Sequence, residues 1–259
     1  MDKKLSVLIL AKNEEKYIGD AIRSAQFADE IVVIDDFSDD RTVEIAESLG
    51  ARVVQHALNG NWGEQRNYAI AEAKYDWLYF LDADERITKK LAASIQSVVT
   101  KNEPVVYSNA RLSYYWEQPL AHGGWYPDYC VRLLPKDGTY VTGLVHEAMH
   151  YKYELKKFPE EARLIHYPYK SWEHYFGKFN TYTTLAAQKM KDEGKRASFR
   201  DVLLHPLGAF LKMYVFKAGF KDGRLGLILA CFHFAYTMAK YVKLYYLEKS
   251  NGQVGDETC

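Results

Sequence analysis

The first 84 residues alternate between apolar segments and segments with helical spacing, and this order limits the possible folds more than any other feature. The apolar segments, which predict strands, are residues 5–11, 30–36, 51–57 and 76–84. The segments between them, which predict helices, are residues 13–28, 38–50 and 63–74. Continuous apolar strands separated by helices are typical of parallel sheets that helices cover. We therefore predict an α/β domain with a mostly parallel sheet.

Polar residues stand where three of these strands end. They are Asn13 and Glu14 after the first strand, Asp35, Asp36 and Ser38 after the second, and Asp82 and Asp84 after the fourth. Parallel sheets of this kind bind ligands beyond the carboxyl ends of their strands. We therefore interpret the clusters as one site rather than as three unrelated solvated turns.

The last cluster, in DWLYFLDADERI, places three carboxylates within four residues: Asp82, Asp84 and Glu85. Carboxylates at this spacing can bind a hard divalent cation, which would remove their mutual repulsion. The alternative is that Asp84 and Glu85 begin a helix over residues 85–99, where acidic side chains stabilise the first turn. The position after the fourth strand favours the metal site.

Composition bounds the class of protein. Lys plus Arg and Asp plus Glu number 34 each, so the net charge gives no indication of nucleic-acid binding. The cysteines, Cys130, Cys231 and Cys259, are odd in number and far apart, which argues against a disulfide framework or zinc site and fits a reducing cytoplasm. The N-terminal apolar run is too short for a signal peptide, and no uninterrupted apolar run reaches the roughly 18 residues of a spanning helix.

The rest of the chain has a different character. Residues 105–116 and 129–135 predict strands, and the Gly-, Pro- and aromatic-rich segment between them is typical of a binding loop. Helices are predicted over residues 171–194, 199–220 and 223–249. These helices are rich in Leu, Phe and Tyr with interspersed lysines, and the longest uncharged stretch, Leu225 to Ala239, has 15 residues. They suit a membrane surface or an oligomer contact.

Three motifs, LSVLILAKNEE, EIVVIDDFSDDRT and DWLYFLDADE, resemble those of family 2 glycosyltransferases of the GT-A fold. Four further segments are similar to the bacterial subgroup of lipopolysaccharide-core and lipooligosaccharide β-glucosyltransferases: GEQRNYAI, PDYCVRLLPKDGTYVTGLVHE, HPLGAFLKMYVFKAGFKDGRLG and AKYVKL. The resemblance implies a Rossmann-like GT-A domain with a helical C-terminal extension. We expect a nucleotide-sugar half at residues 1–100, an acceptor-side half at 101–168 and the extension at 169–259.

The resemblance also implies roles at the donor site. Asp36 would contact the uracil of a UDP-sugar, with Asp35 as its neighbour. Ala11, Asn13 and Glu14 would line the nucleotide pocket. UDP-glucose is the donor that the resemblance indicates.

A divalent cation is the cofactor that the resemblance implies. Asp84 would hold Mg²⁺ or Mn²⁺ on the diphosphate, while Asp82 would face the ribose or the metal. Arg66 would either meet the pyrophosphate or be a surface arginine. A bound cation would stabilise the charge that develops on the leaving UDP.

The acceptor hydroxyl needs a general base, and the chain departs from the Glu-Asp pair of many family members by having GLVHE. Glu147 is the first candidate base and Asp128 the second, with His146 as a possible metal or phosphate ligand. Acceptor-side contacts are expected from Trp125, Tyr126 and Arg132, each of which could instead be structural.

We therefore predict a metal-dependent, inverting hexosyltransferase that acts on a glycan or glycolipid acceptor, such as lipopolysaccharide core, at the inner face of the cytoplasmic membrane. Its partners would be a UDP-sugar, the acceptor, and a peripheral membrane surface or a second copy of the chain, which do not exclude each other. Alternatives are transfer to a peptide or polyprenyl phosphate, nucleotidyl transfer, and a sugar-nucleotide-binding module without catalysis. A nucleotidyltransferase would usually have a Gly-rich basic loop after the first strand, which AKNEEKYIG lacks.

Overall fold

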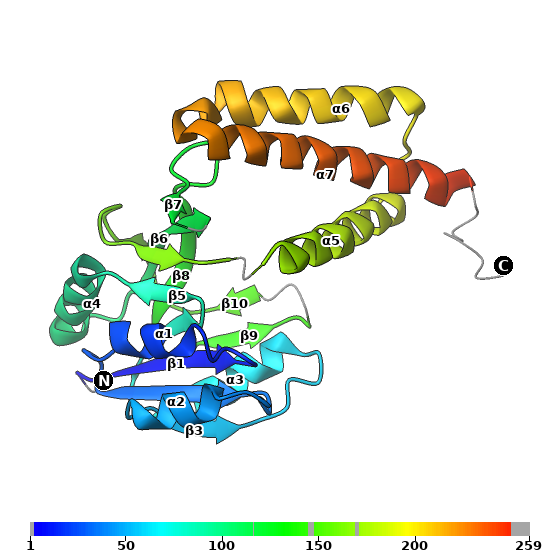
Figure 1. Cartoon of the computed structure of the whole chain (residues 1–259). Helices are drawn as coiled ribbons and strands as arrows, with labels where there is room; N and C mark the ends of the chain where they lie inside the picture. The colour runs from blue at the N-terminus through cyan, green and yellow to red at the C-terminus, as the bar shows by residue number, and fades with distance from the viewer. Residues whose placement is uncertain (1–2, 116, 145–147, 169–170, 250–259) are drawn as a thin grey trace. The chain divides into compact units, whose positions relative to one another are not determined.

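The computed structural model describes residues 3–115, 117–144, 148–168 and 171–249 (Figure 1). The chain forms two compact units, which are described separately. The first unit comprises residues up to 112 together with residues 127–167, and the second comprises residues 113–126 together with those from 168 onward.

The first unit is built on a twisted mixed sheet. Its parallel part consists of β1 Leu5–Ala11, β2 Glu30–Asp35, β3 Arg52–Gln55 and β4 Trp77–Asp82, in the order β3-β2-β1-β4. The sheet continues through β8 Asp128–Pro135, β6 Val106–Tyr115, β12 Leu164–His166 and β5 Glu85–Ile87, with β11 Leu155–Lys157 beside β6. A separate hairpin pairs β9 Tyr140–Thr142 with β10 Ala148–His150. The prediction of an α/β fold with a mostly parallel sheet is confirmed.

Two hydrophobic cores lie on opposite faces of the parallel strands, because alternate residues of a strand point to opposite faces. Val7 and Ile9 of β1 belong to the core beneath the helices α1 Ile18–Ser24, α2 Thr42–Ser48 and α4 Lys89–Lys101. Leu8 belongs to the other core, beneath α3 Trp62–Glu72 and the β9–β10 hairpin. Strands buried on both faces explain why the segments are continuously apolar.

Strand register brings the predicted polar clusters to one edge. Ala11 at the end of β1 is the neighbour of Asp35 on one side, and Leu10 is the neighbour of Asp82 on the other. The chain passes from β1 outward to β2 and β3 and then returns to β4, so β1 and β4 flank a topological switch point. Such switch points are the usual ligand sites of open α/β sheets.

The segment after β4 differs from the helix-cap alternative. Glu85 lies in strand β5, and α4 begins at Lys89 with Thr88 as its N-cap, whose hydroxyl accepts a hydrogen bond from the Leu91 amide at 3.3 Å. The alternative that Asp84 and Glu85 cap a helix over 85–99 is therefore wrong. The three intervening residues pair with β12 instead of continuing into a helix.

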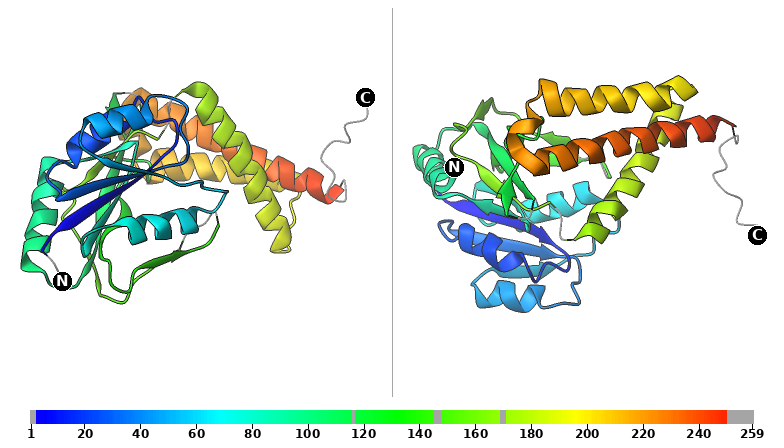
Figure 2. Two further views of the ribbon diagram at one scale, coloured as in Figure 1. Left: turned by 90° about the horizontal axis from the view of Figure 1, so that it is seen from below. Right: turned by 45° about the horizontal axis from the view of Figure 1, so that its top comes forward.

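The second unit consists mainly of helices (Figure 2). They are α5 Trp172–Asp192, α6 Phe199–Leu211 and α7 Gly223–Lys249, and α6 lies alongside α7. A π-helical turn η1, Lys212–Phe216, and a 3₁₀ turn η2, Gly219–Asp222, join α6 to α7. The short strand β7, Gln118–Pro119, pairs with the end of β6.

One helical stretch among the described residues, 219–247, is long and apolar enough to cross a membrane by length and composition. Its mean hydropathy is 1.4, and 28% of its most apolar window is buried. Counting only uninterrupted apolar runs missed this stretch, because the average tolerates an isolated charge. Length and composition alone do not distinguish a spanning helix from a helix in a core.

Candidate active site

A pocket of about 180 Å³ opens at the carboxyl end of β1. Its lining residues come from three neighbouring segments and are Leu10, Ala11, Lys12, Glu14, Asp36, Leu58, Trp62 and Gln65. Three of the residues expected to contact the nucleotide, Ala11, Glu14 and Asp36, therefore line one cavity. Trp62 adds an aromatic side chain that was not singled out from the sequence.

Asp35 and Asp36 have different environments although they are adjacent. Asp35 is fully buried and accepts a hydrogen bond from the Ser38 amide at 3.0 Å, so it holds the turn after β2. Asp36 accepts a hydrogen bond from the Leu58 amide at 3.0 Å and forms an ion pair with Lys12 at 3.2 Å. Asp36 is thus the carboxylate that faces the pocket.

Asn13 and Glu14 connect the loop after β1 to the loop after β2. Asn13 adopts a left-handed conformation with φ of 55°, its amide donates to the Ser38 hydroxyl, and its side-chain oxygen accepts from the Asp39 amide. The Glu14 amide donates to the Thr42 hydroxyl at 2.7 Å. These bonds fix the rim of the pocket.

Helix α3 presents three consecutive side chains to three different places, as the turn of a helix requires. Gln65 lines the pocket and exchanges hydrogen bonds with His56. Arg66 lies 3.6 Å from a carboxylate oxygen of Asp82. Asn67 donates to and accepts from the backbone of Val141, with both distances 2.8 Å, and so joins β9 to the helix.

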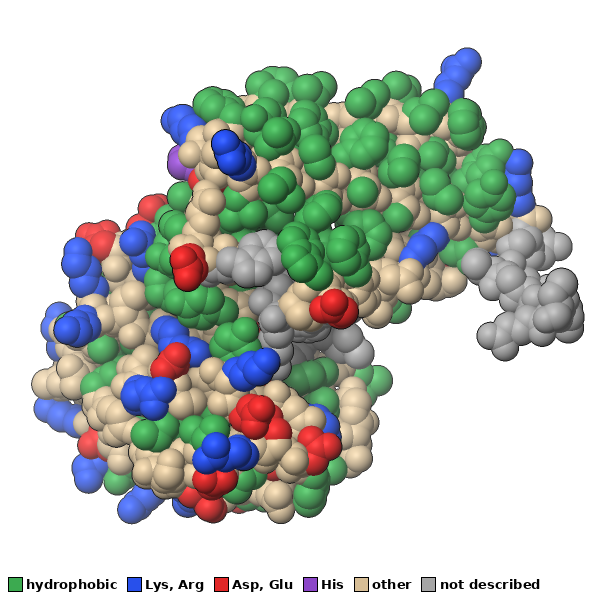
Figure 3. All heavy atoms as spheres, in the orientation of Figure 1, with side chains coloured by type: hydrophobic (Ala, Val, Ile, Leu, Met, Phe, Trp, Pro, Cys, Tyr) green, Lys and Arg blue, Asp and Glu red, His purple; other side chains and the backbone are tan. Residues whose placement is uncertain are grey.

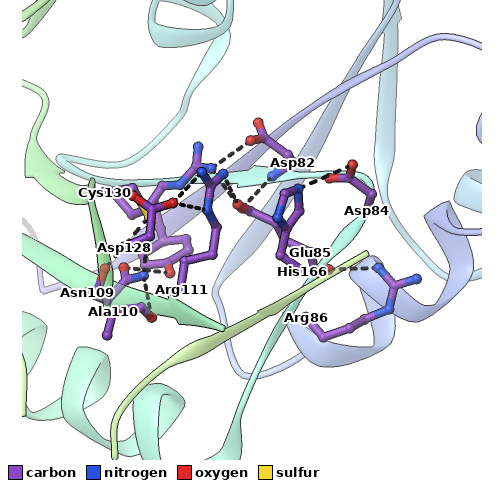
Figure 4. A network of polar contacts seen from close by, with 12 residues as sticks. Asp82, Asp84, Glu85, Arg86, Asn109, Ala110, Arg111, Asp128, Cys130 and His166 are labelled. Atoms are coloured by element: carbon purple, nitrogen blue, oxygen red, sulfur yellow. Dashed lines mark hydrogen bonds and ion pairs between the residues drawn. The ribbon is translucent and has the colours of Figure 1, made fainter. Parts of the chain in front are cut away.

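A chain of alternating charges lies beside the end of β4 (Figure 4). Arg132 Nη2 is 2.6 Å from an oxygen of Asp82 and 2.6 Å from an oxygen of Glu85. Arg111 is 3.2 Å from Glu85 and 2.6 Å from Asp128. Arginine side chains therefore relieve the repulsion between the carboxylates of Asp82 and Glu85. The sequence-based interpretation had given this role to a metal ion.

Burial and the neighbouring arginines together give the two inner carboxyl groups different pKa values. Glu85 is fully buried, and this burial raises the pKa of its carboxyl group despite the opposing effect of Arg132. Burial would also raise the pKa of Asp82, but Arg132 and then Arg66 hold that pKa well below its usual range. Asp82 therefore presents an ionised carboxylate whose orientation the arginines determine.

Asp84 faces His166, with 3.6 Å between a carboxylate oxygen and Nε2 (Figure 4). The antiparallel pairing of β12 with β5 causes this contact, because it places His166 opposite Glu85 and lets the Tyr167 amide donate to the Asp84 carbonyl. Sequence reasoning missed His166, since 82 positions separate it from Asp84 and a single His in a short strand carries no motif. Among the described residues, no three or more His, Cys, Asp or Glu side chains are grouped to hold a metal.

The remaining predicted residues are distributed differently. Asp128 has a 47% exposed side chain and accepts two hydrogen bonds from Arg111 through Oδ2. Trp125 and Tyr126 belong to the second unit. Glu147 and His146 lie outside the described residues. Strand pairing brings Arg111 and Glu85 together in the network, and the sequence did not reveal this pairing.

Comparison with known proteins decides the family. The model of glycosyl transferase family 2 matches residues 6–158, which is more than half of the chain.

The chain belongs to glycosyl transferase family 2.

This glycosyltransferase has relatives of similar length. A protein of Rickettsia bellii described as an uncharacterized glycosyltransferase is 28% identical over 274 residues, covering 100% of this chain and 90% of the relative. The lipopolysaccharide core biosynthesis glycosyltransferase LpsC of Rhizobium meliloti is 27% identical over 254 residues, covering 93% and 92%. The crystal structure of S. aureus TarS 1–349 in complex with UDP-GlcNAc has a TM-score of 0.50 and 16% identity, covering 96% and 92%, which is a likeness of fold.

Proposed function

We propose that this glycosyltransferase transfers a hexose, specifically glucose, from a UDP-sugar to a glycan or glycolipid acceptor of the lipopolysaccharide-core type. The observation that carries the proposal is a pocket lined by Asp36 and Trp62 on the same sheet edge as the Asp84–His166 pair. The named role of LpsC in lipopolysaccharide core biosynthesis supports the acceptor class.

The pocket has the chemistry that a uracil base requires. A carboxylate such as Asp36 can accept the imide N–H of uracil, and the Trp62 ring offers an aromatic surface to a flat base. At about 180 Å³ the cavity is too small for a whole nucleotide-sugar, because drug-sized ligands occupy roughly 300–1,000 Å³. We assign it to the base, with the diphosphate directed toward Arg66 and Asp84.

The donor atoms of Asp84 and His166 fit a divalent cation. Mg²⁺ is commonly bound through one or two carboxylates together with substrate phosphates, and imidazole is an additional ligand for transition metals. We assign Mn²⁺ or Mg²⁺ to Asp84 and His166, with Asp82 restrained by its arginine partners. Such a cation, when bound, stabilises the charge that develops on the leaving diphosphate.

A single displacement by the acceptor hydroxyl would invert the anomeric configuration, so an α-linked donor would give a β-linked product. Glu147 remains our first candidate for the base that takes the hydroxyl proton, and Asp128 the second. The Oδ2 atom of Asp128 is already engaged by Arg111, which favours Glu147. Glu147→Gln is expected to retain UDP-glucose binding and to lose transfer, whereas full transfer activity would direct attention to Asp128.

A panel of nucleotide-sugars tests the donor assignment. We expect UDP-glucose with Mn²⁺ to raise the thermal unfolding midpoint more than UDP-galactose, UDP-GlcNAc or GDP-mannose, because a ligand that binds only the native state stabilises it. Asp36→Asn should reduce the shift given by every UDP-sugar. A larger shift with GDP-mannose than with any UDP-sugar would overturn the assignment.

We propose in addition that α6 lies on the surface of an anionic membrane. Large apolar side chains recur every four residues along α6 and η1 and are about half exposed or more: Phe199, Leu203, Leu207, Leu211 and Val215. Residues four apart lie on one side of a helix, and Figure 3 shows apolar side chains gathered over α6 and α7. Exposed arginines, Arg196 and Arg200, stand at the start of this apolar face, as anionic lipid would require.

Vesicle flotation tests the membrane assignment. The protein should float with phosphatidylglycerol vesicles and not with phosphatidylcholine vesicles, and Leu207→Glu should abolish flotation. Absence of flotation together with a concentration-dependent dimer that Leu207→Glu disrupts would instead assign the apolar face to a second copy of the chain.

A further inference from the structure

The second unit contains a pocket of its own, with a volume of about 290 Å³. We call it the cation pocket, and its lining residues are Gly123, Gly124, Trp125, Ala209, Lys212, Met213, Lys217 and His233. Three of these side chains are basic, and none is acidic. The volume lies at the lower end of the range for small-molecule sites, large enough for a phosphate group with part of its carrier.

Among the residues that the structure describes, no counterion neutralises the positive charge of this pocket. Within the described parts of the chain, no carboxylate lies within 4 Å of the Lys212 or Lys217 ammonium group. The nearby Asp222 is buried, and its two oxygens accept from the ring and the backbone amide of His122 at 2.7 and 2.9 Å. Asp222 therefore anchors the loop and does not neutralise the lysines.

The charges are close enough to influence one another. Burial lowers the pKa of His233, and Lys240, Lys217 and Lys212 lower it further. The native chain thus keeps several basic groups near one cavity at an electrostatic cost. An anion bound among them would remove that cost.

The backbone that carries the lysines is irregular and tightly packed. Lys212 begins the π-helical turn and Lys217 follows it, and π-helical turns are rare and frequent at functional sites. Ala218, the next residue, has a φ of 55°, which is uncommon for a residue other than glycine. A side chain at Gly226 would overlap the Gly219 carbonyl, so this hairpin is held backbone against backbone.

The loop opposite is shaped to admit Lys217. Gly123 and Gly124 have φ of 69° and 87°, and the Gly123 amide donates to the Lys217 carbonyl at 2.9 Å. A Cβ at Gly124 would overlap Lys217 Nζ. The ring of Trp125 packs edge-on against Tyr115 at 5.7 Å, which holds its indole at the pocket wall.

We propose that the cation pocket binds a phosphate or pyrophosphate group carried by the acceptor, through Lys212, Lys217 and His233. The proposal rests on the proposed glycosyltransferase function and specifies its substrate, because it makes the acceptor a phosphorylated glycan or a phosphate-bearing lipid. Ammonium groups bind phosphate as charge-assisted hydrogen-bond donors, and a neutral imidazole such as that of His233 can donate through its N–H. The Trp125 ring would contact the adjoining sugar or lipid.

Isothermal titration with inorganic pyrophosphate, in EDTA and without UDP-sugar, tests the site directly. The wild type should show saturable binding, and Lys212→Gln and Lys217→Gln should each weaken it about tenfold or more. Lys221→Gln, which removes an equal charge from an exposed position outside the pocket, should bind as the wild type does. Equal affinity in all four proteins would overturn the proposal. The test needs no metal and no donor, so it can succeed or fail independently of the UDP-glucose assignment.

Competition then identifies the carrier of the phosphate. If the acceptor is a lipid, vesicles of phosphatidylcholine and phosphatidic acid in equal parts should displace pyrophosphate from the wild type, whereas pure phosphatidylcholine vesicles should not. If the acceptor is a soluble phosphorylated glycan, glucose 6-phosphate should displace pyrophosphate and the vesicles should not. Both results support the pocket, provided that Lys217→Gln abolishes the displacement. Displacement that persists in Lys217→Gln would overturn the assignment to an acceptor phosphate. So would a failure of both competitors to displace pyrophosphate from the wild type.

Discussion

The charge network of the first unit and the cation pocket of the second arrange their charged groups in opposite ways. Around Asp82 and Glu85, each carboxylate lies within 2.6 Å of an arginine nitrogen. Around His233, the neighbouring charged groups are the lysines Lys240, Lys217 and Lys212. The first arrangement satisfies its own charges and therefore fixes geometry. The second leaves charge for a ligand to satisfy.

This difference has a consequence for stability. Removing a cation from a self-neutralised network strands buried carboxylates, whereas removing a cation from an uncompensated cluster relieves repulsion. Equivalent substitutions in the two units should therefore have effects of opposite sign on the free energy of unfolding. Donor binding and acceptor binding would then depend on differently built sites.

The largest effect is expected from Arg132→Met. Glu85 is fully buried and the Arg132 side chain only 7% exposed, so removal of the guanidinium should cost about 3–5 kcal/mol of unfolding free energy. Chemical denaturation measures this. Lys152→Met breaks an ion pair whose side chains are 52% and 62% exposed, and should leave the denaturation midpoint almost unchanged. Similar losses in the two variants would contradict the role of burial.

A smaller loss is expected from Asn67→Ala. It removes both hydrogen bonds to the backbone of Val141, which is only 3% exposed, at a cost of about 1–3 kcal/mol. Because β9 precedes the segment that contains Glu147, transfer should fall in kcat with little change in the KM for UDP-glucose. Gln188→Ala, which removes an exposed amide bonded to Asp192, is the matched control. If Asn67→Ala is destabilised but its kcat is unchanged, the contact between α3 and β9 is not needed for catalysis.

Lys217→Gln should not destabilise the protein. Loss of one of several like charges should leave the free energy of unfolding unchanged or raise it by tenths of a kcal/mol, on the order of a surface like-charge pair. The same denaturation series measures it beside Arg132→Met. A loss of unfolding free energy comparable to that of Arg132→Met would show that Lys217 has an internal partner. The proposed difference between the two units would then be wrong.

The smallest effect concerns pH. The folded-state pKa of His233 is below its unfolded value of about 6.5, so the unfolded chain takes up a proton that the folded chain does not. Stability should therefore fall as the pH drops below about 6.5, toward the folded pKa. The difference in melting temperature between wild type and His233→Gln, followed from pH 8 to pH 5, isolates this contribution. Added pyrophosphate should diminish this pH-dependent difference in melting temperature. A difference of opposite sign would contradict the claim that lysines surround His233.

Local patterns predicted the first half of the fold well, and the reason is physical. Strands buried on both faces require uninterrupted apolar residues, so β1, β2 and β4 were visible as runs, and their parallel order followed from the helices between them. The polar ends of these strands then indicated the site edge. Gly50, with a φ of 83°, stands just past the end of α2, where glycine commonly ends a helix.

Contacts between distant segments could not be predicted in this way. The Arg132 and Arg111 side chains reach Glu85 only because β8 and β6 pair within the same sheet, and His166 reaches Asp84 only through the β12–β5 pairing. These strands are short or antiparallel and carry no motif that specifies their partners. The sequence therefore suggested that a metal ion neutralises Asp82 and Glu85, whereas in the structure the arginines neutralise them. The cation pocket was also missed, because its loop and its lysines are about 90 positions apart.

The most direct test of the account is titration of UDP-glucose with and without Mn²⁺, in the wild type and in Asp84→Asn. We predict that Mn²⁺ tightens binding to the wild type by at least about tenfold, that His166→Gln reduces this gain, and that Asp84→Asn abolishes it. Asp82, Arg132 and Glu85 should remain in place in these variants, so the circular dichroism spectrum and unfolding midpoint serve as controls. Equal affinity with and without Mn²⁺ in the wild type would contradict the proposed metal-dependent donor site.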